Sequence, residues 1–490
     1  MKYFNVIVIF LFALILFGLE PRQFGFDLSG HLGWVPSHTS AQMIKASLKN
    51  HFVGYTLRTI SKDGLLGYYY FDRYPVFFSA FVKLVLSPFE SDLRYWFYFS
   101  KVLMNLLFLG MIIYAFRITG YFFKDVFKRW SVIFLSFSSF YFLNYKSMIH
   151  FDQPAIFGMV ALVDSILSFE VNRKKRLLIF WSIVAPLLGR GYANLFVLAL
   201  YFIFKLIKNR GQVKEVIRLS LITLLPGTIL CTSMLFYNIS VEAEIRNVSY
   251  KDVSIVQSAR SRLGIDKFEG AVEESVDWVP FTTGQFKRLI LQLTPHFIGK
   301  KYAVYYVTLL FILLIWLYRK KELFPEKSAL YFLSFLFCTG FFWLFPMKRL
   351  AAFHDYTAMY YWGVSLSFYI LLFHRIEKAK IGFLFASALM VLSLFRATGE
   401  NKARLAEINS IADDFHKIRQ VLADRGGEAR IYSVNGFRDI LPGRPYILGF
   451  YFYDKTLAYD EENANYVLST TKLANWPLLV EGTYLNLYSR

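Results

Sequence analysis

The sequence predicts a mainly α, polytopic membrane protein. Of the 490 residues, 56% are hydrophobic and only 18% are charged, whereas about 25% of the residues in a soluble domain are charged. The hydrophobic residues are concentrated in long apolar runs, and short links rich in lysine and arginine separate these runs. Long apolar runs are typical of spanning helices, and basic links are typical of the cytoplasmic side of membrane proteins. We therefore expect a chain that crosses the bilayer many times.

The apolar runs predict about eleven transmembrane helices, because a spanning helix needs ~20 apolar residues. The first run resembles a signal-peptide core, but no small-x-small cleavage site follows it, so we expect a retained first helix. The segment 74–89 is short and bounded by prolines, which indicates an interfacial or re-entrant segment. The expected spans are 3–19, 96–116, 131–148, 153–169, 177–189, 193–207, 217–238, 302–318, 329–345, 357–374 and 380–396.

The basic residues predict the orientation. If the segment 74–89 does not cross, basic clusters fall on every second link, and the positive-inside rule places these links on the inner side. A net charge of +20 would also suit nucleic-acid binding, but clustering between apolar runs argues against nucleic acid as a partner. The outer face then carries the loops 20–95 and 240–300 and the C-terminal tail. The basic links are residues 124–129, 173–176, 205–214, 319–321 and 374–380.

The composition becomes that of a soluble domain from Thr398 onward. Apolar residues recur every three or four positions between Leu405 and Leu422, which predicts a helix with one apolar face, and Gly426-Gly427 ends it. Strand-like runs follow, so we expect a transmembrane module at 1–396 and a small α/β domain at 397–490 on the outer face. The expected strands are Arg430–Val434, Tyr466–Ser469 and Leu478–Tyr488, and an amphipathic helix is expected earlier, at Thr283–Leu293.

Acidic, basic and aromatic residues gather in several outer loops beside the membrane. A carboxylate there can take a proton from an acceptor hydroxyl, and arginine or lysine can bind a phosphate leaving group and stabilise its growing charge. This combination suits transfer from an anionic, lipid-linked donor. The candidates are Asp27, His31, Tyr70, Asp72, Arg73, His150, Asp152, Arg190, Lys348, Arg349, His354 and Tyr356.

Simpler interpretations compete for several of these residues. Lys348, Arg349 and His354 are also suited to anchoring helix ends. His31 and His38 lie in an aromatic loop, where a packing role is common. Asp152 precedes Gln153-Pro154 and fits an N-cap, because an aspartate side chain accepts hydrogen bonds from helix N–H groups. The neighbours Asp72 and Arg73 fit a surface ion pair, which contributes little.

Five motifs in register resemble the GT-C polytopic glycosyltransferases, in particular the branch of bacterial protein O-mannosyltransferases and aminoarabinose transferases. Asp27 stands where the family has an acidic motif after its first helix. Tyr70-Phe71-Asp72-Arg73-Tyr74-Pro75 is similar to a Tyr-Phe-Glu-Lys-Pro-Pro-like stretch, and Asp152-Gln153-Pro154 matches an Asp-x-Pro that opens a helix. Arg190-Gly191 resembles a Lys-Gly pair, and His354-Asp355-Tyr356 resembles a tyrosine-containing segment near the last spans. The resemblance covers residues 1 to roughly 370.

The resemblance implies inverting transfer of a sugar from a polyprenyl-phosphate donor on the periplasmic face of a bacterial inner membrane. Asp27 would be the base that activates the acceptor, a glycan, lipid or protein of the cell envelope such as lipopolysaccharide. Arg73 and Arg190 would hold the donor phosphate, with Tyr70, Lys348 and Arg349 beside it. Asp152 would support this acid site or orient a donor or acceptor group. The supporting residues would be His31, Asp72, His150, His354 and Tyr356.

Two further points bear on mechanism. Position 28 is leucine, where the family usually has a second acid after the residue that Asp27 matches, so we predict no obligatory metal and no other cofactor. Two rival functions remain open. A transporter or flippase of lipid-linked sugars would have charges near the midplane of its spans and paired halves. An O-antigen-type ligase or polymerase would use a pyrophosphate-linked donor instead of a monophosphate-linked one.

Overall fold

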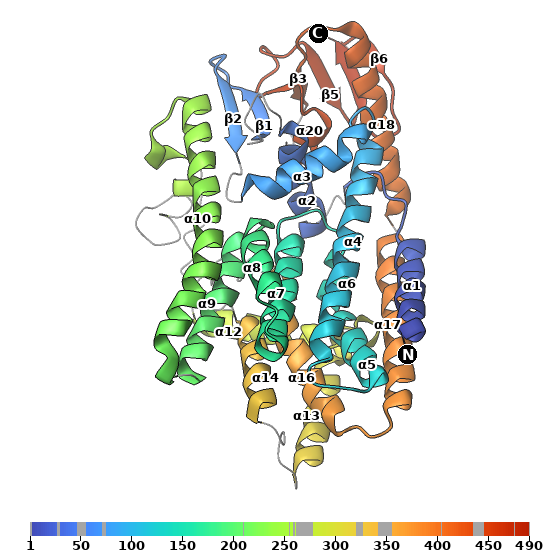
Figure 1. Ribbon diagram of the computed structural model, residues 1–490. Coiled ribbons are helices and arrows are strands. Elements are labelled where there is room, and N and C mark those ends of the chain that lie inside the picture. Colours follow the sequence, from blue (N-terminus) through green and yellow to red (C-terminus); the bar gives the residue numbers. More distant parts are fainter. Residues whose placement is uncertain are drawn as a thin grey trace.

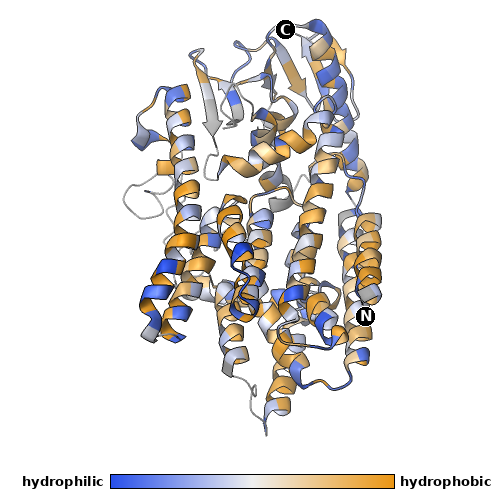
Figure 2. Cartoon of the chain, in the orientation of Figure 1, coloured by the Kyte–Doolittle hydropathy of each residue, from blue (hydrophilic) through white to orange (hydrophobic). Residues whose placement is uncertain are grey.

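A computed structural model shows a bundle of helices with a mixed β-sheet at one end (Figure 1). The two parts differ in hydropathy: apolar residues dominate along the bundle, whereas hydrophilic residues gather at the sheet and at the opposite end of the bundle (Figure 2). The structure describes residues 2–26, 30–46, 55–70, 75–208, 210–253, 255–257, 260, 278–319, 327–341, 355–402, 404–434, 445–474 and 476–489.

Within these residues, 6 helices are long and apolar enough to cross a membrane, so the chain is a multi-pass membrane protein. Helices also lie at the other expected spans, but they are shorter. The 6 long helices are α4 (Leu93–Thr119), α7 (Asp152–Asn172), α9 (Gly191–Lys208), α10 (Val213–Arg246), α13 (Ala303–Tyr318; Lys300–Tyr318 with the preceding 3-10 turn) and α17 (Ala379–Lys402). The shorter ones are α1 (Lys2–Leu19), α5 (Val126–Phe137), α6 (Phe140–Tyr145), α8 (Lys175–Val184), α14 (Lys327–Thr339) and α16 (Trp362–Arg375).

The expected helix at 131–148 is broken into α5 and α6, and the one at 177–189 ends in a turn of 3-10 helix. The segment 74–89 forms α3 (Val76–Leu86), which lies between the bundle and the sheet (Figure 1). The amphipathic segment forms α12 (Trp278–Gln292), as expected. The 3-10 turns are η2 (Ser87–Phe89), η3 (Ala185–Leu187), η4 (Arg210–Gln212), η5 (Tyr250–Asp252), η6 (His296–Ile298), η7 (Lys300–Tyr302) and η9 (Asp355–Tyr361).

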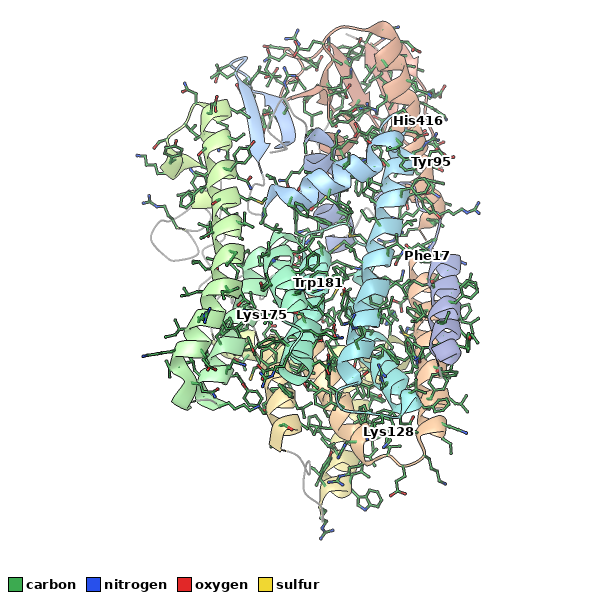
Figure 3. All side chains as sticks on the ribbon, in the orientation of Figure 1. Phe17, Tyr95, Lys128, Lys175, Trp181 and His416 are labelled. Atoms are coloured by element: carbon green, nitrogen blue, oxygen red, sulfur yellow. The ribbon has the colours of Figure 1, made fainter. Side chains whose placement is uncertain are left out.

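Helix α4 relates the two ends of the bundle. Its N-cap is Asp92, whose carboxylate accepts the backbone N–H of Arg94 at 3.0 Å. The Arg94 guanidinium then pairs with Asp413 of α18 (Leu405–Arg425) at 2.6 Å, which ties the start of α4 to the sheet end. Because α4 runs away from this point for 27 residues, the basic link that follows it lies at the far end. Figure 3 shows Lys128 of that link and His416 of α18 at opposite ends.

The sheet combines two distant parts of the chain. Residues of the first outer loop form the antiparallel strands β1 (Tyr55–Ile60) and β2 (Leu66–Tyr70), which sequence reasoning missed. Strand β1 pairs in parallel with β4, so the sheet order is β2-β1-β4-β3-β5-β7-β6. The segment Leu478–Tyr488, which was expected to form a single strand, instead contains a turn between two antiparallel strands. The C-terminal strands are β3 (Arg430–Ser433), β4 (Thr456–Ala458), β5 (Tyr466–Ser469), β6 (Leu478–Val480) and β7 (Asn486–Ser489).

Helix α2 (Gly30–Lys45) lies between the sheet and the bundle and packs against α20 (Pro445–Tyr451) and β1. One apolar cluster joins these layers. Phe26 from the loop after α1 packs edge-on against Phe97 of α4 and Phe450 of α20, with ring centroids 4.5 and 5.0 Å away. The loop that follows the first helix is therefore held by both the bundle and the C-terminal helices. The division into domains at 396/397 stays a prediction.

Asp414 of α18 anchors the turn between β6 and β7. Its carboxylate is fully buried and accepts the backbone N–H groups of Thr483, Tyr484 and Leu485 at 3.0, 2.7 and 3.1 Å. Asp414→Ala is expected to cost about 2–3 kcal/mol of stability, because it leaves several amides without an acceptor. The measurement is thermal unfolding of the purified protein in detergent.

The neighbouring Asp413 provides the matched control. Its side chain is 49% exposed and pairs with Arg94, so Asp413→Ala is expected to cost under about 1 kcal/mol. Equal losses for the two variants would show that the carboxylate–amide contacts of Asp414 do not stabilise the turn.

Candidate functional site

Asp152 is the centre of a buried polar cluster at the start of α7. Its side chain is fully buried, and its Oδ1 lies 2.6 Å from Nε of Arg190. The Tyr360 hydroxyl donates to the same oxygen at 2.9 Å, and His150 Nδ1 pairs with Oδ2. Residue 151 is the N-cap of α7 and makes no side-chain capping bond, so the N-cap interpretation of Asp152 is wrong. A buried carboxylate needs such partners, because an unpaired charge in an apolar interior is costly.

Arg190 reaches this cluster from the loop between η3 and α9. Its side chain is 1% exposed, and its backbone N–H donates to the Phe151 carbonyl at 3.3 Å. The guanidinium Nη2 also donates to the Tyr356 hydroxyl at 3.4 Å. Arg190 therefore connects the start of α7 with the segment before α16. A guanidinium has five donors in a fixed fork, a geometry that matches carboxylate and phosphate oxygens.

Aromatic rings enclose the polar cluster. Tyr356 packs edge-on against His150, with centroids 5.3 Å apart, and against Tyr145 of α6 at 6.0 Å. The Tyr145 hydroxyl donates to Asp355 Oδ1 at 2.8 Å. On the other side, His38 of α2 lies 6.1 Å from the His150 ring, also edge-on. Helix α2 thus covers the cluster on the side of the sheet.

A second buried cluster lies beside the first, and sequence reasoning missed it. Glu20 follows α1 directly, and its Oε1 lies 2.8 Å from Nζ of Lys101 in α4. Lys146, just after α6, pairs with Oε2 of the same carboxylate, and Asn105 Nδ2 donates to that oxygen at 3.1 Å. The sequence feature that could have revealed this cluster is Lys101, a lysine inside the apolar run 96–116. Such a charge in a span needs an explanation.

The charge state of Glu20 follows from its partners. Burial alone would raise the pKa of the Glu20 carboxyl, but the ammonium groups of Lys101 and Lys146 outweigh burial and hold the pKa below its ordinary value. Glu20 is therefore ionised at neutral pH. The carboxylate, which follows α1, joins this helix to α4 through Lys101 and Asn105 and to the end of α6 through Lys146.

The structure brings together four of the residues that the sequence singled out, namely His150, Asp152, Arg190 and Tyr356. The roles expected for them stay predictions. His31 lies in the first turn of α2 and Tyr70 ends β2, but the side chains of both lie outside the described residues. The remaining candidates lie wholly outside the described residues: Asp27, Asp72, Arg73, Lys348, Arg349 and His354.

The described residues contain no group of three or more His, Cys, Asp and Glu side chains arranged to hold a metal ion. In the first cluster, His150 and Asp152 are of these types, and they pair with each other. The expectation that no metal is required stays a prediction.

Comparisons with known proteins find similar chains among the solved structures. No protein-family model matches the sequence, and no curated protein matches it. Among solved structures, the chain is similar to the crystal structure of ArnT from Cupriavidus metallidurans in the apo state, with 10% sequence identity and a TM-score of 0.47. The match covers 100% of this chain and 98% of that chain.

Proposed function

We propose that this protein is a membrane glycosyltransferase of the GT-C type. It transfers a sugar from a polyprenyl-phosphate donor to a hydroxyl of a glycan, lipid or protein acceptor. The observation that carries the proposal is the buried Asp152–Arg190–Tyr356 cluster at the sheet end of a membrane bundle, opposite a basic link. If the positive-inside rule holds, this end faces the periplasm of a bacterial inner membrane.

The chemistry uses one base and a cationic leaving-group site. Asp27 takes the proton of the acceptor hydroxyl, and the hydroxyl oxygen attacks the anomeric carbon of the donor sugar. The bond from that carbon to the phosphate oxygen breaks with inversion, and polyprenyl phosphate leaves. Arg190 stabilises the negative charge that grows on the phosphate. Asp152 holds the guanidinium in place and is itself held by His150 and Tyr360.

The apolar, water-excluded surroundings strengthen this electrostatic contribution. Asp152 is fully buried and Arg190 is 1% exposed, and charges interact more strongly at low dielectric than in water. Asp152 is therefore a positioning residue in this proposal, because its carboxylate already accepts a hydrogen bond from Tyr360 and pairs with Arg190 and His150. The base must come from elsewhere. The sequence offers Asp27, the residue after Phe26, whose ring packs against α4 and α20.

The test is transfer of a labelled sugar from a polyprenyl-phosphate donor by the purified protein. Asp27→Asn is expected to abolish transfer while the protein stays folded, because the amide does not accept a proton at neutral pH. Asp63→Asn, in the exposed turn between β1 and β2, is the matched control and should transfer at the normal rate. Turnover by Asp27→Asn would remove Asp27 from the role of base. Turnover only with a pyrophosphate-linked donor would favour the ligase or polymerase.

A further inference from the structure

The Glu20 cluster holds more positive than negative charge. Lys101 and Lys146 are 6% and 7% exposed, Glu20 is 8% exposed, and both ammonium groups bind the one carboxylate. The other contacts of the lysines are neutral: Lys101 donates to Gln23 Oε1 at 3.1 Å, and Lys146 donates to Asn105 Oδ1 at 3.4 Å. Among the residues that the structure describes here, one buried cation therefore lacks a counter-ion.

Neighbouring charges do not remove this excess. Arg190 and Asp152 balance each other at 2.6 Å. The next carboxylate, Asp355, accepts the Tyr145 hydroxyl at 2.8 Å, and no ion pair joins it to either lysine among the described side chains. Burial of a net charge is costly unless an opposite charge compensates it. Ionisable residues inside spanning segments are accordingly functional candidates, and Lys101 lies in the span α4.

The two clusters are adjacent. Gln153, next to Asp152, donates through Nε2 to the Met104 carbonyl at 2.9 Å, and Met104 precedes Asn105, the partner of Glu20. A second connection runs through α6, because Lys146 follows Tyr145, whose ring packs on Tyr356. The excess positive charge thus lies beside the proposed phosphate-binding arginine.

We propose that Lys101 and Lys146 form an anion subsite that binds the phosphate of the lipid-linked donor, with Glu20 holding the two ammonium groups together. This inference rests on the proposed function, which supplies the donor. One excess positive charge matches a single phosphodiester, which carries one negative charge, better than a pyrophosphate diester, which carries two. The subsite therefore favours a monophosphate-linked donor.

The subsite can be tested because the lysines and Glu20 carry opposite charges, so removing one or the other should have opposite effects on phosphate binding. Lys146→Met keeps the length of the side chain and removes a positive charge, so it should weaken binding of polyprenyl phosphate about tenfold or more. Glu20→Gln removes the negative charge, so it should leave that affinity unchanged or increase it. A cluster with a purely structural role predicts instead that both changes lower stability and that neither changes the preference for phosphate.

The assay is native mass spectrometry of the full-length protein in detergent with three lipids: polyprenyl phosphate, polyprenol and phosphatidylglycerol. Lys205→Met is the matched control, because Lys205 also forms a buried pair with a glutamate, Glu170, in another part of the bundle. We expect Lys146→Met and Lys101→Met to lower the ratio of polyprenyl-phosphate to polyprenol affinity, and Glu20→Gln and Lys205→Met not to lower it. If Lys146→Met does not fold, Lys101→Met and Glu20→Gln carry the same test.

The outcomes separate this inference from the proposed function. In one outcome, the wild-type protein prefers polyprenyl phosphate to polyprenol and transfers sugar, but Lys146→Met and Lys101→Met leave this preference unchanged. That outcome would overturn the subsite and leave the proposed function intact. An equal, lysine-dependent preference for phosphatidylglycerol would assign the lysines to bilayer lipid and would also overturn it. Wild-type protein that neither prefers the phosphate nor transfers sugar would overturn the proposed function first.

Discussion

Arg190→Leu is expected to lower sugar transfer at least 100-fold, the loss typical of removing one donor that stabilises transition-state charge. The guanidinium lies 2.6 Å from Asp152 and 3.4 Å from the Tyr356 hydroxyl, so its removal also leaves a fully buried carboxylate without its strongest partner. Loss of one member of a buried ion pair typically costs about 3–5 kcal/mol. The measurement is transfer rate per folded molecule, with the folded fraction taken from size-exclusion chromatography.

A double variant separates the two effects. Arg190→Leu combined with Asp152→Asn removes both charges, so much of the lost stability should return. Transfer should stay low, because the leaving phosphate still lacks its cation. Recovery of transfer along with stability would show that Arg190 only neutralises Asp152.

The matched control is the pair between a second buried aspartate of α7, Asp164, and an arginine of α4, Arg117, which is 45% exposed. Arg117 Nη2 lies 2.9 Å from Asp164 Oδ2, and Asp164 is fully buried, but this pair lies near the end of α4 that points away from the sheet. Arg117→Leu with Asp164→Asn should retain near-normal transfer. Arg190→Lys keeps a charge without the planar fork, so an intermediate loss, about tenfold, is expected from it.

Periodicity and charge placement explain which parts of the fold were predictable. The spans at α4, α7, α9, α10, α13 and α17 were expected because ~20 apolar residues in a row have few alternatives to a spanning helix. The hairpin β1–β2 was missed because its strands are short and pair with β4, almost four hundred residues away in sequence, through the parallel register Thr59–Leu457. Such pairing depends on tertiary contacts and leaves little local signal.

The same distinction applies to the site. Asp152 and Arg190 were found because each belongs to a short motif with a recognisable neighbour, Gln153-Pro154 and Gly191. Tyr360 was not found, because the chain has many tyrosines and no sequence motif distinguishes this one. Its hydroxyl reaches Asp152 only in the folded protein. Glu20 was overlooked for a related reason. Its two lysines lie about 80 and 130 residues further along the chain, and no sequence pattern links them.

The glycines on either side of Arg190 explain why the motif has its particular form. Gly189 has a φ of +63°, in the left-handed region that side chains rarely adopt. A Cβ atom on Gly189 would lie 2.0 Å from the Phe151 carbonyl oxygen, and one on Gly191 would lie 1.8 Å from that of Pro186. The Phe151 carbonyl also accepts the Arg190 backbone N–H. The close approach of these backbones therefore places the guanidinium beside Asp152.

Gly189→Ala and Gly191→Ala are accordingly expected to lower transfer at least 100-fold per folded molecule, because a shift of about 1 Å in a positioned group can cost that much. Each should also lower stability by roughly 3 kcal/mol or more, since the added Cβ forces backbone to move. Gly399→Ala in α17, where nothing lies within 4 Å of the added Cβ, is the control and should stabilise the helix by about 0.5–1 kcal/mol. Normal transfer by either of the first two variants would mean that Arg190 does not need its observed position, and its proposed contact with the donor phosphate would then be wrong.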